Sequence, residues 1–475
     1  MNREQDGKNA AKSAVFYTIS NIISIIASFI AIKILSSAMS TSDMGIATSF
    51  ITLLEIFGYI CLFSLNISVN RAMLDFKNEK EKYLSSIYIF SSLSVVFFFG
   101  IYLIFKTFIN NLFGFSTELM CLLFLLMFCI NGYSLIFNKW NFQNRYKRTF
   151  TLTLFASPIA QALSVLLVFY LSTNKYLGRI LGTQIFSAVL GIVFGIMILI
   201  QGKFFFSKKH LNYGLKFSVP MIPHLLSQIL LANCDLLMIK NIIGSSEAGL
   251  YSMSYTIATI LFMVLVQLLR PWSPWVYRRL EEKETDGIKD KANLLASFCF
   301  ICCVGLCVVA PDLIKIFLDK SYLDSIYLVA PICVGLFFRV IYIFFYDIEY
   351  FYKKTKQIAV ISIIVCTINI ILNYIFINQY GYQAAAYTTL ISYLILALFN
   401  YIGAKRVIDK SIYDDKYFLL ISILCMATSM GSLVFINNYF IRYGILILSI
   451  IVTLFLQKSN IKYMMNLVKD FMKKK

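Results

Sequence analysis

Long apolar runs make up most of this chain, and short polar stretches separate them. A helix needs about 20 consecutive apolar residues to cross the hydrocarbon core of a bilayer, because every backbone polar group must be satisfied within the helix itself. The pattern therefore predicts an all-α polytopic membrane protein with about 14 transmembrane helices. The predicted spans are residues 13–36, 44–66, 83–105, 117–137, 150–171, 177–200, 214–240, 248–270, 292–311, 326–347, 357–377, 383–404, 417–436 and 441–456.

Composition agrees with this prediction. Hydrophobic residues make up 59% of the chain and charged residues 14%, whereas about 25% of a soluble domain is charged. All 11 cysteines lie inside predicted spans, so we expect no disulfide framework. Cys299, Cys302, Cys303 and Cys307 have helical spacing, for which packing is favoured over a metal site. The sequence thus indicates no metal and no cofactor.

The basic residues predict how the chain is oriented in the membrane. With the N-terminus in the cytoplasm, the inside segments hold 33 of the 43 Lys and Arg residues, and the outside loops hold five. An excess of basic residues in cytoplasmic loops is the usual pattern, so both termini are expected inside. The formal net charge of +19 then reflects topology and attraction to membrane lipids, and it does not indicate nucleic acid binding.

Two weak internal matches share one offset. Ser42-Asp43-Met44-Gly45 matches Ser246-Glu247-Ala248-Gly249, and Asn174 and Tyr176 match Asn378 and Tyr380, each 204 residues later. The common offset predicts two parallel six-helix lobes, with substrate binding between them near the bilayer midplane. The expected division is 1–200 (spans 1–6), a cytoplasmic linker at 201–213, 214–404 (spans 7–12), and 405–475 (spans 13 and 14 with a basic tail). The linker is either an interfacial amphipathic stretch or a solvated one.

Polar residues interrupt several predicted spans at helical spacing. His224, Gln228 and Asp235 lie on one stripe of the seventh span, because steps of four and seven residues return to the same face. The second span carries a comparable stripe with Glu55 and Asn66. Polar groups inside a bilayer are costly, so these faces are expected to turn toward the bundle interior or a wet cavity.

Several short motifs resemble bacterial polysaccharide (O-antigen, Wzx-type) flippases of the MATE/MOP superfamily. The similarity rests on Phe217–His224, Asp235, Gly249-Leu250-Tyr251, Trp272-Ser273-Pro274-Trp275, Tyr380-Gly381, Ala384-Ala385-Ala386 and Thr389–Tyr393. It implies two six-helix lobes that open alternately to each side of the bacterial inner membrane. The implied substrate is an undecaprenyl-pyrophosphate-linked oligosaccharide, the repeat unit of an O-antigen, capsule or exopolysaccharide. Leu236 stands where the family often has arginine, so the role of that arginine is not transferred.

Such a substrate needs cations for its pyrophosphate and polar or aromatic groups for its sugars. Arg339, deep in the tenth span, suits phosphate geometry, and the alternative is a structural ion pair with Asp235 or Glu55. Arg270 and Lys33 are the other candidate cations, for which snorkelling to the interface is the alternative. Asn66, Tyr342 and Gln228 are candidate sugar contacts, and helix packing is the competing interpretation.

The buried ionisable residues are also candidates for ion coupling. Asp235 and Glu55 either bind a proton or sodium ion that drives transport, or they pair with a cation in the cavity. His224 either titrates near neutral pH or is a neutral hydrogen-bonded residue.

Two further protein classes compete with a flippase as interpretations of the sequence. A cation-coupled multidrug (MATE-type) antiporter of the same superfamily is the alternative, and it would depend on buried carboxylates. A membrane glycosyltransferase is disfavoured, because the outside loops are short and nearly free of paired carboxylates and no phosphate-binding loop is present. We therefore expect no enzyme activity. Polysaccharide polymerase machinery is an expected protein partner.

Overall fold

The computed structural model describes residues 23–142, 146–269, 272–408 and 412–458. These residues form helices and connecting turns, and the described part of the chain contains no strand. The chain divides into two compact units, unit 1 at Met1–Gly249 and unit 2 at Leu250–Lys475, and each is described by itself. Arg270 and most of the basic tail lie outside the described residues.

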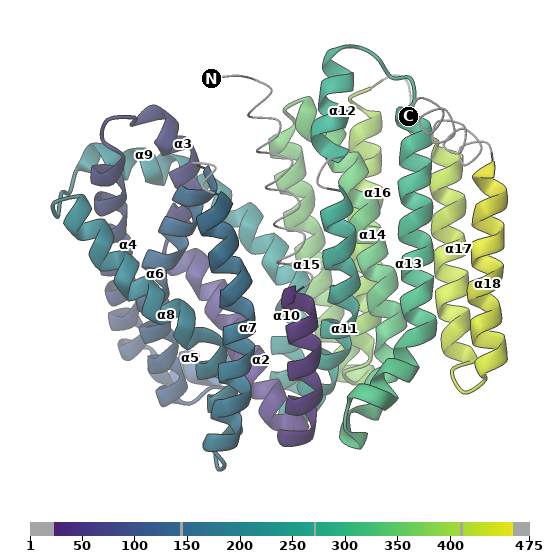
Figure 1. Ribbon diagram of the computed structural model, residues 1–475, viewed down its shortest axis with the longest axis horizontal. Coiled ribbons are helices and arrows are strands. Elements are labelled where there is room, and N and C mark those ends of the chain that lie inside the picture. Colours follow the sequence, from purple (N-terminus) through teal and green to yellow (C-terminus); the bar gives the residue numbers. More distant parts are fainter. Residues whose placement is uncertain (1–22, 143–145, 270–271, 409–411, 459–475) are drawn as a thin grey trace, which may run out of the picture. The chain divides into compact units, whose positions relative to one another are not determined.

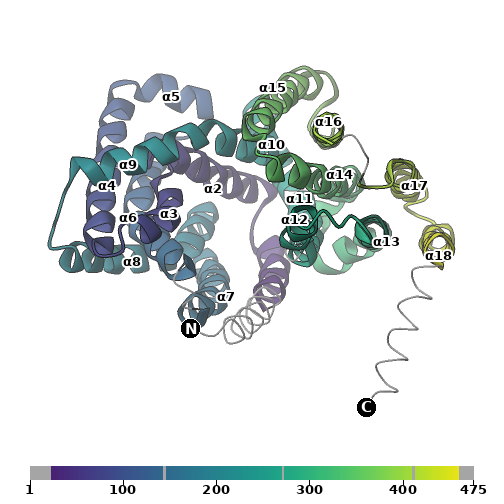
Figure 2. The same cartoon turned by 90° about the horizontal axis from the view of Figure 1, so that it is seen from above.

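Unit 1 is a bundle of long helices with shorter ones at its ends (Figures 1 and 2). Its helices are Ile23–Ala38, α2 (Thr41–Cys61), η1 (Leu65–Ile67), α3 (Ser68–Asp75), α4 (Lys80–Ile104), α5 (Lys106–Phe113), α6 (Thr117–Phe142), α7 (Tyr146–Tyr170), α8 (Lys175–Gln201), α9 (Lys208–Ser218), η2 (Val219–Met221) and α10 (Ile222–Ile242). Helix α11 (Ser245–Leu269) begins in this unit and continues into the next.

Unit 2 is also helical, and α13, α14, α16 and α17 run side by side in Figure 1. Its helices are α12 (Trp272–Glu281), α13 (Ile288–Phe317), η3 (Lys320–Ser325), α14 (Ile326–Phe351), α15 (Thr355–Tyr380), α16 (Ala384–Lys405), α17 (Asp415–Val434) and α18 (Tyr439–Leu456). The segment Lys320–Phe351 comprises η3 and α14, and 89% of the residues in its most apolar stretch are buried. The corresponding value for α18, Tyr439–Leu456, is 17%. Helix α14 is therefore the central helix of unit 2, and most of its side chains face protein.

The predicted transmembrane architecture is confirmed. Within the described residues, eleven helices are long and apolar enough to cross a membrane, and Ile23–Ala38 and the Leu154–Tyr170 part of α7 are shorter apolar segments. Every predicted span overlaps one of these helices or α11. The protein is an all-α, multi-pass membrane protein.

One boundary differs from the prediction, and one predicted connection contains a helix. The second span was expected to continue to residue 66, but α2 ends at Cys61, and Phe63 and Ser64 take the left-handed conformation, with φ of 50° and 49°. The predicted linker at 201–213 is helical from Lys208, and α9 continues through η2 into α10. Pro220 lies in that 3-10 turn, which fits a residue that cannot donate a backbone hydrogen bond.

The two matched glycine motifs are in reciprocal contact inside unit 1. A Cβ atom on Gly45 would overlap the backbone oxygen of Ser245 and lie 2.8 Å from the nitrogen of Gly249. A Cβ atom on Gly249 would in turn overlap the backbone oxygen of Thr41. The hydroxyls of Thr41 and Ser246 are 2.6 Å apart beside this contact. Glycine at both positions thus allows the starts of α2 and α11 to meet backbone to backbone.

Candidate functional site

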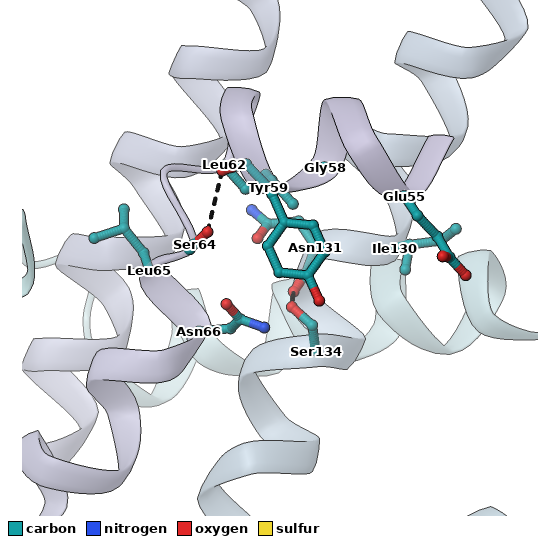
Figure 3. Close-up of a pocket in the computed structure, with 10 residues that line it drawn as sticks. All are labelled: Glu55, Gly58, Tyr59, Leu62, Ser64, Leu65, Asn66, Ile130, Asn131 and Ser134. Atoms are coloured by element: carbon teal, nitrogen blue, oxygen red, sulfur yellow. Dashed lines mark hydrogen bonds between the residues drawn. The ribbon is translucent and has the colours of Figure 1, made fainter. Parts of the chain in front are cut away.

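A cavity of about 390 Å³ opens within unit 1 and brings two of the predicted site residues together (Figure 3). Glu55, Gly58 and Tyr59 come from the last turns of α2, and Asn66 comes from η1. The other lining residues are Leu62, Ser64, Leu65, Ile130, Asn131 and Ser134, the last three from α6. The cavity therefore forms where α2 ends beside the middle of α6.

The end of α2 shapes this cavity because the chain leaves the helix abruptly. Two consecutive non-glycine residues in the left-handed region, Phe63 and Ser64, are energetically unfavourable, and the surrounding structure must hold them there. The Ser64 hydroxyl donates to the carbonyl of Tyr59 at 3.1 Å, and the Ser94 hydroxyl donates to the carbonyl of Cys61 at 2.6 Å. These bonds satisfy carbonyls that the interrupted helix leaves unpaired.

The polar lining is fixed on one side and open on the other. Asn131 is held by α4, because its side-chain nitrogen donates to the hydroxyls of Ser91 at 2.7 Å and Ser92 at 3.1 Å. Glu55 is exposed to the cavity, and no described residue forms a hydrogen bond or ion pair with its carboxylate. In Figure 3 the ring of Tyr59 and the side chains of Asn66 and Ser134 lie around the same space.

This lining suits binding rather than covalent chemistry. Amide, hydroxyl and phenol groups can donate to and accept from a polyhydroxylated solute, and the carboxylate can accept a proton or bind a cation. Among the described residues, no group of three or more His, Cys, Asp or Glu side chains could hold a metal ion.

A half-buried arginine in unit 2 has an aromatic rather than an acidic environment. The guanidinium carbon of Arg339, on the central helix α14, lies 4.6 Å from the ring centroid of Phe262 and 5.6 Å from that of Tyr393. No carboxylate among the described residues of unit 2 lies within ion-pair distance of it. Tyr342, one turn further on, is buried and its ring lies 5.4 Å from that of Tyr346. Arg339 is thus a cation that aromatic faces stabilise.

The remaining predicted residues are distributed over other parts of unit 1. Asp235 is fully buried on α10, where the Cys234 thiol lies 3.6 Å from its Oδ1, and Gln228 and His224 are half-buried toward the start of the helix. His224 Nδ1 has no hydrogen-bond partner among the described residues. Lys33 is exposed near the end of helix Ile23–Ala38.

Three polar sites were missed by the sequence reasoning. Arg179 on α8 donates to Gln161 Oε1 at 2.8 Å and to the Ser164 hydroxyl at 3.0 Å, both on α7. On α14, Asp347 accepts from Tyr277 at 2.8 Å, and Glu349 is fully buried with no hydrogen-bond partner among the described residues. Gln161 within an apolar run and the acidic pair at the end of the tenth span were the available signals.

A further buried polar network in unit 2 links α15 and α16. Asn369 donates to the Ser392 hydroxyl at 3.1 Å, Asn373 donates to Asn369 Oδ1 at 3.2 Å, and the Thr388 hydroxyl donates to Asn373. All four side chains are fully or almost fully buried. The hydrogen bonds satisfy groups that would be costly in an apolar environment.

Comparison with known proteins adds a family and a fold to this description. The model of a family described as polysaccharide biosynthesis protein matches residues 34–327, more than half of the chain. The chain is similar to the lipid II flippase MurJ in an inward closed conformation, with a TM-score of 0.71 and 20% identity over 94% of this chain and 100% of that one. It is also similar to an inward-facing multidrug resistance MATE family transporter of the MOP superfamily, with a TM-score of 0.60 and 14% identity over 83% of this chain and 97% of that one.

None of the curated protein sequences compared with this chain matches it. At 14–20% identity, the two structural relatives establish a common fold, which accounts for the long apolar helices described above. The match over residues 34–327 establishes the family. The chain thus has a fold similar to those of MurJ and the MATE transporter, and it belongs to the family of polysaccharide biosynthesis proteins.

Proposed function

We propose that this protein is a flippase that carries an undecaprenyl-pyrophosphate-linked oligosaccharide across the bacterial inner membrane by alternating access. The observation that supports this most directly is the cavity lined by Glu55, Tyr59 and Asn66 within a membrane-spanning bundle. Moving a glycan through bare hydrocarbon would leave many hydroxyl groups without hydrogen bonds, which is prohibitive. A polar cavity removes that cost. A transporter, rather than an enzyme, is the function that this lining suits.

In this proposal the substrate's parts are bound by different residues. Hydroxyl and amide groups around Asn66 hydrogen-bond to sugar. Arg339 binds the pyrophosphate, because a guanidinium presents paired N–H donors to phosphate oxygens. Tyr342 and Gln228 extend the sugar contacts, and Arg270 and Lys33 attract the head group as it enters and leaves. The hydrocarbon tail stays in lipid throughout.

Transport is driven by a coupled cation in the same proposal. Glu55 and Asp235 are the carboxylates that would bind a proton or sodium ion, and His224 is the remaining titratable group on the seventh span. The proposed lobes, 1–200 and 214–404, exchange access to the two sides of the membrane. Residues 201–213 connect them, and 405–475 adds the last two helices and a cytoplasmic tail.

The experiment is deletion of the gene, followed by analysis of surface glycan and of lipid-linked precursor in the inner leaflet. Loss of glycan with accumulation of precursor is expected, and normal glycan display would contradict the proposal. Complementation with Arg339→Ala is expected to lower export about 10- to 100-fold, because a hydrogen bond to a charged group contributes about 1.5–3 kcal/mol. Arg339→Lys should recover part of it. Arg406→Ala, which removes an exposed arginine at the end of α16, is the matched control.

A multidrug antiporter is the second candidate, and the carboxylate of Glu55 favours it. An acidic group that is open to a cavity and has no described ion-pair partner suits a cationic drug as well as a coupling ion. Expression in a drug-sensitive host and in the glycan-deficient deletion strain separates the two functions. Rescue of glycan display without drug resistance supports the flippase. Drug resistance without rescue supports the antiporter.

A further inference from the structure

A second cavity of about 340 Å³ lies at the end of unit 1 where α4 begins and α8 ends. Lys77 and Asn78 come from the α3–α4 turn, Lys80 and Lys82 from the first turn of α4, and Lys203 from the segment after α8. Glu79, Glu81, Gln201 and Gly202 complete the lining. The loop charges predict that this end faces the cytoplasm.

Both carboxylates of this cavity are already engaged by other side chains. Both oxygens of Glu81 accept from Lys139 at 2.7 Å, and Lys139 is almost fully buried. Glu79 Oε2 lies 3.2 Å from Nε2 of His210, a buried side chain of α9. Among the described residues, no carboxylate forms an ion pair with any of the four lining lysines, Lys77, Lys80, Lys82 and Lys203.

The backbone adds to the positive character of the cavity. Helix α4 is 25 residues long and starts at Lys80, and its N-cap residue, Glu79, makes no side-chain capping bond. The first backbone N–H groups of a helix have no partner within the helix, and the helix dipole places partial positive charge at this end. Uncapped N–H groups and four lysines thus converge on one cavity, an arrangement that favours phosphate-bearing ligands.

Exposed aromatic side chains follow immediately after the basic residues. Lys203 and Phe204 have φ values of 52° and 51°, so the segment turns sharply after α8. Phe204 is 66% exposed and Phe206 is 45% exposed, whereas Phe205 lies under the ammonium group of Lys82, 5.0 Å from its ring centroid. Basic residues beside exposed phenylalanines suit the boundary between lipid head groups and acyl chains. The cavity therefore belongs to the membrane surface.

We propose that this cavity binds the phosphate head group of an anionic phospholipid of the inner leaflet. Basic pockets at the cytoplasmic ends of transmembrane helices recognise such head groups. The volume corresponds to about 11 water molecules at about 30 Å³ each. That is room for a phosphoglycerol head group. The binding site is separate from the proposed transport cavity, and it does not require the protein to be a flippase.

The test compares full-length variants by lipid titration in non-ionic detergent, read by native mass spectrometry with phosphatidylglycerol as probe. The cavity variant is Lys77→Gln/Lys80→Gln/Lys82→Gln/Lys203→Gln. The matched control, Lys353→Gln/Lys354→Gln/Lys356→Gln/Lys416→Gln, removes the same charge from exposed lysines of unit 2. Each lysine near an anionic surface contributes about 1 kcal/mol, so the cavity variant should bind phosphatidylglycerol at least about tenfold more weakly. The control should stay within about twofold, and phosphatidylcholine should bind all proteins equally.

Three results would overturn the assignment. Equal losses in the cavity variant and the control would show a general charge effect. Unchanged binding in a cavity variant with normal unfolding temperature would remove the site. Displacement of phosphatidylglycerol by millimolar inorganic pyrophosphate would assign the cavity to a soluble phosphate compound. A variant with all four cavity lysines replaced by arginine keeps the charge and should retain affinity for phosphatidylglycerol. This variant checks that the Lys→Gln substitutions act through charge and not through folding.

Discussion

Glu55 occupies an unusual position for an ionisable side chain in a membrane-spanning helix. Its carboxylate is open to a cavity, while the neighbouring amide of Asn131 is fixed by two serines of α4. A carboxylate has no donor to satisfy when it is ionised, so it responds to whatever cation or hydroxyl group enters. Asn66, in the same cavity, has no charge to change. Substitutions at these two residues can therefore distinguish a role in ion coupling from a role in sugar binding.

Substitution of Glu55 by glutamine keeps the size and removes the charge. In the complemented deletion strain, we expect Glu55→Gln to lower glycan export more than tenfold and to abolish its dependence on the proton or sodium gradient. Asn66→Ala should lower export about two- to tenfold, because one hydrogen bond contributes about 0.5–1.5 kcal/mol, and gradient dependence should remain. Export by Glu55→Gln at the normal rate and with normal gradient dependence would exclude Glu55 as the coupling residue.

At the scale of helices, the hydrophobic pattern was informative and the cavity was only partly predictable. Apolar runs located each span, and helical spacing grouped Glu55 with Asn66, which line one cavity although α2 ends between them. No glycine or proline directly follows Cys61, so the sequence does not mark the end of α2. Tertiary hydrogen bonds hold the break instead, such as the one from the Ser94 hydroxyl to the Cys61 carbonyl. Asn131 and Ser134 come from α6, about 70 residues away, and periodicity within one span cannot pair them with α2.

The contact between α2 and α11 depends on two small residues, which gives a stability prediction. Gly45→Ala places a Cβ atom against the backbone of Ser245 and Gly249, which cannot move aside as a flexible side chain would. Such overpacking costs about 1–3 kcal/mol, so the purified variant should unfold at a lower temperature. The control is Gly431→Ala in α17, where no neighbouring atom lies within 4 Å. Alanine favours a helix interior, so this control should unfold at the normal temperature or above it. Equal unfolding temperatures for both variants would refute the packing argument.

At the scale of the whole molecule, an even number of spans and the excess of basic residues on one side together predict the topology. All 11 cysteines are free, and in the structure each is buried or half-buried. Exposed turn residues can therefore be replaced singly by cysteine and labelled with a membrane-impermeant maleimide against a low background. Ser172 and Asn437 lie in turns predicted outside, and Asn78 and Glu282 lie in turns predicted inside.

In intact spheroplasts, Ser172→Cys and Asn437→Cys should be labelled, whereas Asn78→Cys and Glu282→Cys should react only after permeabilisation. The physical reason is that 33 of the 43 basic residues would otherwise have to cross the membrane against the potential, at about 2.3 kcal/mol per charge and 100 mV. A complete inversion of the pattern would place both termini outside. Labelling of Ser172→Cys without Asn437→Cys would require an odd number of spans between these residues, and would disprove the predicted arrangement of the later helices.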